Sequence, residues 1–199
     1  KNWYPQLVAL SSSQETEFRL TVAWLMGFDN TSTQFHETLL KLLKDPEPIV
    51  RRNAALALVR FNDSSGREEL VAILKPYPVR APASGVVAST LEEDATLARS
   101  TLIARIQPPG GEIVQVRSPL PGKIEKVVKG RGAQVVQGDE VLTINSDENS
   151  IWEALRGLAL IGTAEDIPVI ESYANSGDVS TRIKEQARST VTTIKKRSS

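Results

Sequence analysis

Two segments of the chain repeat one another, and they lie inside a second, unrelated repeat. The inner repeat aligns Val79–Val87 with Val116–Ile124, and both copies follow the pattern Val-Arg-x-Pro-x-x-Gly-x-Val/Ile. The outer repeat has a helical period and is interrupted between Lys75 and Asp147. Self-similarity of this kind indicates repeated structural units. We therefore expect a helical scaffold that carries a separate module within it.

The outer repeat consists of segments in which apolar residues recur at i, i+4 and i+8, the spacing of one face of an α-helix. Each segment is accompanied by a further amphipathic segment, so the pattern predicts pairs of helices. The apolar positions are Phe18, Val22 and Met26; Val50, Ala54 and Leu58; Ile151, Leu155 and Ala159; and Ile183, Ala187 and Val191. The partner helices are expected at about 3–10, 33–44, 65–75 and 164–175.

This pattern resembles HEAT or armadillo-type helical repeats. Segment 45–58 is similar to the second helix of a HEAT unit, and segment 178–191 is a weaker copy of it. The resemblance covers about 1–75 and 147–197. An ordinary helical bundle is the alternative, because its helices have the same apolar period.

The interruption lies at a turn between the two helices of the third pair. Without residues 76–146, Lys75 would be followed by Asp147, and this junction is similar to the one inside the preceding pair. An exposed turn tolerates an inserted domain well, provided that the two ends of the insert lie close together. We therefore divide the chain into a first helical part at 1–75, an inserted domain at 76–146 and a second helical part at 147–199.

The inserted residues are rich in β-branched residues, glycine and proline, which predicts short strands at close spacing. The two copies of the inner repeat indicate two intertwined halves related by a pseudo-twofold axis. Gly85 and Gly122 each follow a proline turn, where we expect a positive φ or a close approach of backbone. Gly132 and Gly138 of the second half have Asp94 and Ser100 at their places in the first half.

The second half strongly resembles half of a biotinyl/lipoyl-type domain, and the first half is a weaker match. The residues that carry the resemblance are Pro119, Gly122, Gly132, Val135, Gly138, Leu142 and Ile144. The resemblance implies a flattened barrel of two four-stranded halves, called a barrel-sandwich hybrid. HlyD-like membrane fusion adaptors carry the same module unmodified. The expected fold class is α+β multidomain: an α-helical HEAT-like repeat scaffold with an inserted all-β biotinyl/lipoyl-like barrel-sandwich hybrid.

The hairpin between the two halves departs from the carrier members of this family. Carrier domains present a lysine at this tip, and its primary amine forms the amide with the prosthetic group. Here the tip consists of Gln107, Pro108, Pro109, Gly110, Gly111 and Glu112. Biotin or lipoate cannot be attached there without a lysine, so we expect no cofactor. Pro108 and Pro109 stiffen the tip, which together with Glu112 becomes a candidate contact for a partner.

Composition narrows the kinds of partner. The chain has 24 basic and 24 acidic residues and no cysteine. A formal net charge of zero offers no basic surplus for binding nucleic acid, and the lack of cysteine excludes disulfides and thiolate chemistry. No apolar run approaches the about 20 residues that a membrane span needs. We expect protein partners, no nucleic acid, no metal and no membrane span.

The chain begins with Lys1 rather than methionine, so we expect a fragment or a processed product.

The polar side chains do not assemble into a catalytic set. His36 is the only histidine, and no Ser/His/Asp or metal arrangement can be built around it from local spacing. The acidic run at 92–94 fits a solvated turn better than a pair of carboxylates for acid–base catalysis. We therefore expect a protein that is not an enzyme.

Two further groups of residues are candidates for contacts. Arg51 and Arg52 belong to a basic cluster that could meet an acidic partner. The alternative for this cluster is pairing between repeats. The cluster also contains Arg60 and Arg67, and the acidic residues available for pairing are Asp45, Asp63, Glu68 and Glu69. Trp24 is expected in the core, and Trp152 is expected where the inserted domain meets the helices.

The sequence favours a non-catalytic protein–protein interaction scaffold or adaptor, with the inserted domain as an unmodified recognition module. Helical repeats present an extended concave face, built here by the second helices. One alternative, implied by the resemblance to membrane fusion proteins, is a periplasmic or envelope adaptor of a transport system, which favours the cell envelope over the cytoplasm. Another is an accessory or lyase-type HEAT-like protein, although the chain offers few reactive groups for it.

Overall fold

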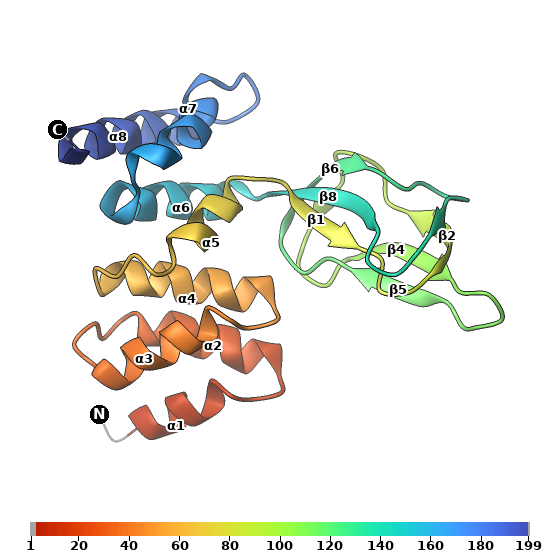
Figure 1. Cartoon of the computed structure of the whole chain (residues 1–199), viewed down its shortest axis with the longest axis horizontal. Helices are drawn as coiled ribbons and strands as arrows, with labels where there is room; N and C mark the ends of the chain where they lie inside the picture. Colours follow the sequence, from red (N-terminus) through yellow and green to blue (C-terminus); the bar gives the residue numbers. More distant parts are fainter. Residues whose placement is uncertain (1–2, 199) are drawn as a thin grey trace. The chain divides into compact units, whose positions relative to one another are not determined.

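The structure is a computed structural model that describes residues 3–198. It is an α+β fold with two compact units (Figure 1). The residues up to Leu74 and those from Asn149 onward form the helical unit, and Lys75–Glu148 form the β unit. Among the residues described, no helix combines the length and apolarity needed to cross a membrane.

The helical unit contains helices that follow one another along a stack in chain order (Figure 1). Local signals set their ends: Pro48 stands at the start of α4, and the Ser32 hydroxyl accepts a hydrogen bond from the Phe35 N–H at the start of α3. The elements are α1 (Tyr4–Leu10), α2 (Thr16–Met26), α3 (Thr33–Leu42), α4 (Pro48–Arg60), α5 (Arg67–Ile73), α6 (Glu148–Ile161), the 3-10 turn η1 (Ala164–Asp166), α7 (Ile167–Asn175) and α8 (Thr181–Ser198).

Two apolar cores hold the stack together, and α4 belongs to both of them. Its Ala54 and Leu58 pack with α1, α2 and α3, while its Ala55 and Val59 pack with the later helices. The predicted apolar stripes are confirmed at most positions, because all but two of their members are buried. Ala159 is half-buried, and the Phe18 side chain is 49% exposed, so the predicted core position of Phe18 is wrong.

The β unit contains two four-stranded antiparallel sheets. One has the strand order β1-β8-β6-β3, and the other has the order β5-β4-β2-β7. The strands are β1 (Tyr77–Arg80), β2 (Gly85–Thr90), β3 (Thr96–Leu97), β4 (Leu102–Gln107), β5 (Val114–Arg117), β6 (Gly122–Val127), β7 (Gln134–Val135) and β8 (Glu140–Ser146). Replacing each of β1–β4 by its counterpart in β5–β8, and the reverse, converts one sheet order into the other. The halves are therefore intertwined around a pseudo-twofold axis, as the inner repeat predicts.

The backbone obeys the same symmetry. Asp94 and Ser100 have φ of 68° and 65°, and the glycines at their places in the second half, Gly132 and Gly138, have φ of 87° and 93°. A Cβ at Gly85 would lie 2.4 Å from the Gln107 carbonyl oxygen. A Cβ at the equivalent Gly122 would lie 2.1 Å from the Asn145 carbonyl oxygen. The predicted close backbone approach is confirmed at both glycines.

Hydrogen bonds across the axis tie the two halves together. Ala81 donates to the Asp139 carbonyl and accepts from the Gly138 N–H, each at 2.8 Å. The equivalent Ser118 donates to the Thr101 carbonyl and accepts from the Ser100 N–H, also at 2.8 Å. Strands β1 and β8 pair antiparallel, with Tyr77 opposite Ile144, so the two ends of the β unit lie side by side.

Candidate protein-binding groove

Large apolar side chains are exposed on the helical unit, among them Trp24, which the sequence predicts in the core. The Trp24 side chain on α2 is 54% exposed and stacks edge-on against Phe28 with ring centroids 4.6 Å apart. Leu160, near the end of α6, is 62% exposed. The prediction that Trp24 is a core residue is wrong, because the core side of α2 is filled by Val22, Ala23 and Met26. A contiguous exposed apolar patch can mark an interaction site, so the surface around Trp24 is a candidate binding surface.

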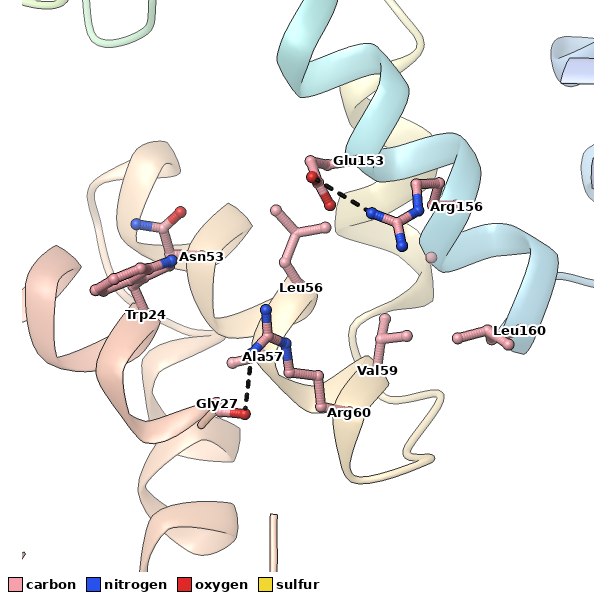
Figure 2. Close-up of a pocket in the computed structure, with 11 residues that line it drawn as sticks. Trp24, Gly27, Asn53, Leu56, Ala57, Val59, Arg60, Glu153, Arg156 and Leu160 are labelled. Atoms are coloured by element: carbon pink, nitrogen blue, oxygen red, sulfur yellow. Dashed lines mark hydrogen bonds and ion pairs between the residues drawn. The ribbon is translucent and has the colours of Figure 1, made fainter. Parts of the chain in front are cut away.

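These side chains border a groove of about 410 Å³ that is lined by α2, α4 and α6 (Figure 2). Trp24 lies on the α2 side and Leu160 on the α6 side, with residues of α4 between them. The complete lining is Trp24, Gly27, Asn53, Leu56, Ala57, Val59, Arg60, Glu153, Arg156, Gly157 and Leu160. A hollow of this size accommodates a few side chains of a partner or a small ligand.

Two glycines allow the helices to approach closely beneath the groove. A Cβ at Gly27 would lie 3.0 Å from the Ala57 Cβ, so α2 ends tightly against α4. A Cβ at Gly157 would lie 2.7 Å from the Leu70 Cδ1, so α6 passes close to α5. The two glycines therefore set how closely the helices that border the groove pack against their neighbours.

Arginine side chains give the groove a partly cationic wall. The Arg60 guanidinium carbon lies 4.8 Å from the centre of the Phe28 ring, and Arg60 Nη1 donates to the Gly27 carbonyl at 3.5 Å. The Arg156 Nη1 lies 3.8 Å from a Glu153 carboxylate oxygen, a weak ion pair between half-exposed groups. The groove therefore combines aromatic and aliphatic surface with two arginines and one carboxylate.

Two arginine side chains contact the ring of Trp152, which belongs to the helical unit. The guanidinium carbons of Arg156 and Arg182 lie 4.5 and 4.1 Å from its ring centre, and the ring packs against the core of the later helices. Cation–π contacts with two guanidinium groups account for the position of this ring. The prediction that Trp152 lies where the inserted domain meets the helices stays a prediction.

Residues 4–86 match the family profile of HEAT repeats. No curated protein sequence gives a significant match to the chain. The matched stretch contains α1–α5 and extends into β2, so its last residues belong to the β unit. The match supports the predicted HEAT-like character of the first helices, and stacked helical repeats of this kind commonly serve as binding surfaces for other proteins.

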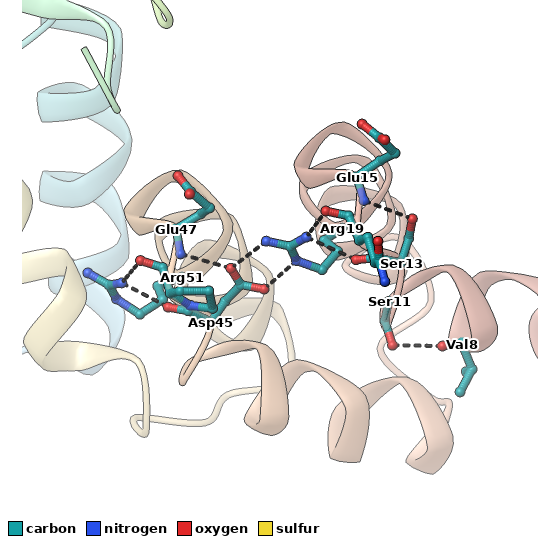
Figure 3. A network of polar contacts seen from close by, with 10 residues as sticks. Val8, Ser11, Ser13, Glu15, Arg19, Asp45, Glu47 and Arg51 are labelled. Atoms are coloured by element: carbon teal, nitrogen blue, oxygen red, sulfur yellow. Dashed lines mark hydrogen bonds and ion pairs between the residues drawn. The ribbon is translucent and has the colours of Figure 1, made fainter. Parts of the chain in front are cut away.

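Of the two arginines predicted to contact a partner, Arg51 lies along a row of polar bonds that also contains Asp45 and Arg19 (Figure 3). Arg19 holds Asp45 through two hydrogen bonds of 2.7 and 3.1 Å. Arg51 pairs with Glu69 at 2.6 Å and donates to the Asp45 carbonyl at 2.8 Å. The alternative of pairing between repeats is therefore confirmed for Arg51. Arg52 is only 4% exposed, which does not favour its predicted contact with a partner.

The His36 side chain is held in place by contacts with two neighbouring side chains. Its Nε2 lies 2.6 Å from the Asp63 Oδ2, and its ring packs 5.3 Å from the Phe61 ring. Burial acts to raise the pKa of Asp63, but hydrogen bonds from Ser65 and then from His36 outweigh it and hold that pKa below its usual range. Within residues 3–198, no three His, Cys, Asp or Glu side chains are grouped so that they could hold a metal ion.

The hairpin tip between β4 and β5 is exposed from Pro109 to Ile113. The Gln107 side-chain amide donates to the Pro108 and Gly111 carbonyls at 3.1 and 2.6 Å, which closes the loop on itself. The predicted partner contacts through Pro108, Pro109 and Glu112 stay predictions.

Sequence reasoning missed most of the groove. Leu160, Asn53 and Glu153 lie outside the apolar stripes from which the helices were predicted, so periodicity does not select them. One signal is present in the sequence: Trp24 lies two residues from both Val22 and Met26, which places it on a helix face that differs from theirs.

Proposed function

We propose that this protein is a non-catalytic scaffold whose helical unit binds a segment of another protein in the groove between α2, α4 and α6. The observation that carries the proposal is the exposure of Trp24 and Leu160 on opposite sides of one groove. Tryptophan and arginine are enriched among the residues that dominate the energetics of protein–protein interfaces. A side chain of the partner that enters between them removes apolar surface from water on both walls.

The polar groups of the groove favour a peptide over a purely apolar ligand. Asn53, Arg60 and Glu153 border the apolar floor formed by Leu56 and Ala57. Interfaces commonly have an apolar centre and a polar rim that bonds to backbone and side-chain groups of the partner. The arrangement therefore fits a short segment that inserts one or two apolar side chains and carries polar groups beside them.

We also propose that residues 76–146 form a biotinyl/lipoyl-like barrel-sandwich hybrid inserted into helical parts at 1–75 and 147–199, and that it acts as an unmodified recognition module. The two intertwined four-stranded sheets support this proposal, as does the division of the chain into two units near these boundaries. The tip at 107–112 has no lysine amine for a prosthetic group. After co-expression with biotin and lipoate ligases, the intact mass should be unchanged. A gain equal to either group would contradict the proposal.

The groove can be tested by photo-crosslinking in the cells that produce the protein. We expect p-benzoyl-phenylalanine at position 160 to yield a discrete adduct with one partner. The matched control places the same group at position 18, where Phe18 is also exposed but does not line the groove. The adduct from position 160 should fall at least about five-fold in Trp24→Ala, whose wild-type side chain is half exposed and lies outside both apolar cores of the helical unit.

With the crosslinked segment synthesised as a peptide, Trp24→Ala should weaken binding by about thirty-fold, the loss of about 2 kcal/mol typical of a dominant interface tryptophan. Phe18→Ala should leave the affinity within two-fold. The groove is not the binding site if position 160 gives no adduct. The same conclusion follows if the two alanine variants bind the peptide equally well.

A further inference from the structure

A second hollow lies within the β unit, and it does not belong to the groove described above. It has a volume of about 380 Å³ and is lined by β1, by β5 and by the turns that follow them. These two strands are the outer strands of their sheets, so the hollow is open to solvent along both. Its lining contains Arg80 and Arg117, two valines and two prolines.

Six of the eight lining residues form three pairs related by the inner repeat, and the other two are Tyr77 and Gln115, whose side-chain oxygen accepts a hydrogen bond from Arg117 Nη2 at 2.8 Å. Val79 pairs with Val116, Arg80 with Arg117, and Pro82 with Pro119. Because each pair lines the same hollow, the hollow lies on the pseudo-twofold axis. The Val-Arg-x-Pro motif of the sequence therefore has a spatial consequence: its two arginines are brought to one site from segments 37 residues apart in the chain.

Each arginine is held by an equivalent backbone contact. Arg80 Nη1 donates to the Gly138 carbonyl at 3.0 Å, and Arg117 Nη1 donates to the Ser100 carbonyl at 2.9 Å. Gly138 and Ser100 occupy corresponding places in the two halves and both have positive φ. These bonds orient both guanidinium groups before any ligand arrives, which lowers the entropy lost on binding.

The positive charge of the site has no internal partner. Among the described residues no carboxylate forms an ion pair with either guanidinium, and no acidic residue lines the hollow. Three arginines of the helical unit behave differently, because Arg19, Arg51 and Arg67 each pair with a carboxylate. Two oriented, unneutralised guanidinium groups at one site attract acid groups, which they can bind through parallel hydrogen bonds.

We propose that this hollow binds a ligand that carries two carboxylate groups, one for each arginine. Its volume lies near the lower end of small-molecule sites. It therefore fits a short dicarboxylate or two acidic side chains of a polypeptide. The apolar valine and proline walls pack against the carbon chain between the two acid groups. This inference is independent of the function proposed for the groove.

The test is a titration of the full chain followed by the backbone amide signals in NMR spectra. Succinate is expected to shift signals of residues 77–82 and 115–119 in a saturable manner, and butyrate, with one acid group, should bind at least ten-fold more weakly. A capped peptide with two aspartate side chains is the second ligand. Tighter binding of succinate identifies a small molecule as the source of the acid groups, and tighter binding of the peptide identifies a polypeptide.

Arg80→Gln and Arg117→Gln should each weaken the better ligand about ten-fold, since each removes charge-assisted hydrogen bonds. Arg131→Gln is the matched control, because Arg131 is an exposed arginine of the same unit that does not line the hollow. Arg80→Lys, which keeps the charge, should give an intermediate affinity and guards against a folding defect. The proposal is overturned if neither ligand shifts these signals, if butyrate binds as well as succinate, or if Arg80→Gln and Arg131→Gln bind equally.

Discussion

Substitution of Gly85 by alanine tests the intertwined arrangement of the β unit directly. Gly85 begins β2, and an added Cβ would lie 2.4 Å from the Gln107 carbonyl oxygen, 2.7 Å from its carbon and 2.9 Å from the Pro108 nitrogen. All three are backbone atoms, and Gln107 is fixed by its pairing with Val86 across the sheet. The clash cannot be relieved by rotating a side chain, so two strands must move apart by more than half an ångström.

The magnitude follows from the nature of the neighbour. Overpacking against movable side chains costs about 1–3 kcal/mol, and contact with fixed backbone belongs at the upper end of that range. Replacement of glycine by alanine also restricts the unfolded chain, and this offsets the loss in the free energy of unfolding by about 0.4–1 kcal/mol. We expect a net loss of about 2–2.5 kcal/mol in the free energy of unfolding. For a unit of this size, that corresponds to a fall of about 10–20 °C in Tm.

The assay is calorimetric unfolding of the full chain, combined with amide hydrogen exchange to assign the loss to one unit. Amides of Lys75–Glu148 should lose protection, and those of the helical unit should not. Gly130→Ala is the matched control because a Cβ there meets nothing within 4 Å. Gly122→Ala, with a Cβ 2.1 Å from the Asn145 oxygen, should cost at least as much as Gly85→Ala. The reasoning is refuted if Gly85→Ala unfolds at the same temperature as Gly130→Ala.

Three further variants probe the helical unit. Arg67→Met should lower the free energy of unfolding of the helical unit by about 3 kcal/mol, measured by thermal unfolding. Arg67 holds the buried carboxylate of Asp166 through two hydrogen bonds of 2.8 Å, and the substitution leaves that charge uncompensated. A loss below about 1 kcal/mol would contradict this. Thr190→Val should cost about 1 kcal/mol, since the buried hydroxyl donates to the Leu155 carbonyl at 2.9 Å, whereas an unchanged Tm would show that this bond is not stabilising. The lowered pKa of Asp63 contributes stability that is complete above its unfolded pKa of 3.8 and is lost as the pH falls through the folded pKa. The difference in Tm between the wild type and Asp63→Asn should therefore shrink between pH 5 and pH 3, and a constant difference would refute the linkage.

Much of the β unit could be predicted because its two halves have proline and glycine at the same positions. Proline and glycine fix where each strand ends, and the expected close approach of backbone is found at Gly85 and at Gly122. The pairing of Arg80 with Arg117 around one hollow could not be predicted in this way. It depends on which strands become outer strands, and this is decided by long-range pairing.

The helical groove shows where periodicity stops being informative. An i, i+4, i+8 stripe identifies one buried face of α2, but it does not say how far the neighbouring helices extend around that face. Trp24 follows Val22 by two residues and so points about 200° away from it around the helix. Hydrophobicity alone assigns such a residue to the core, whereas the side of α2 that bears Trp24 and borders the groove is not covered by another helix.

The adjacent ends of the β unit have a mechanical consequence. A pulling force transmitted along the chain would enter near Tyr77 and leave near Ile144, which are partners on antiparallel strands. Such a force acts along the hydrogen bonds between β1 and β8 and breaks them one after another, instead of loading them all at once in shear. The β unit should therefore open like a zipper at low force from the end where it joins the helices, while bonds that lie deeper across its twofold axis, such as that from Ala81 to Asp139, are loaded last.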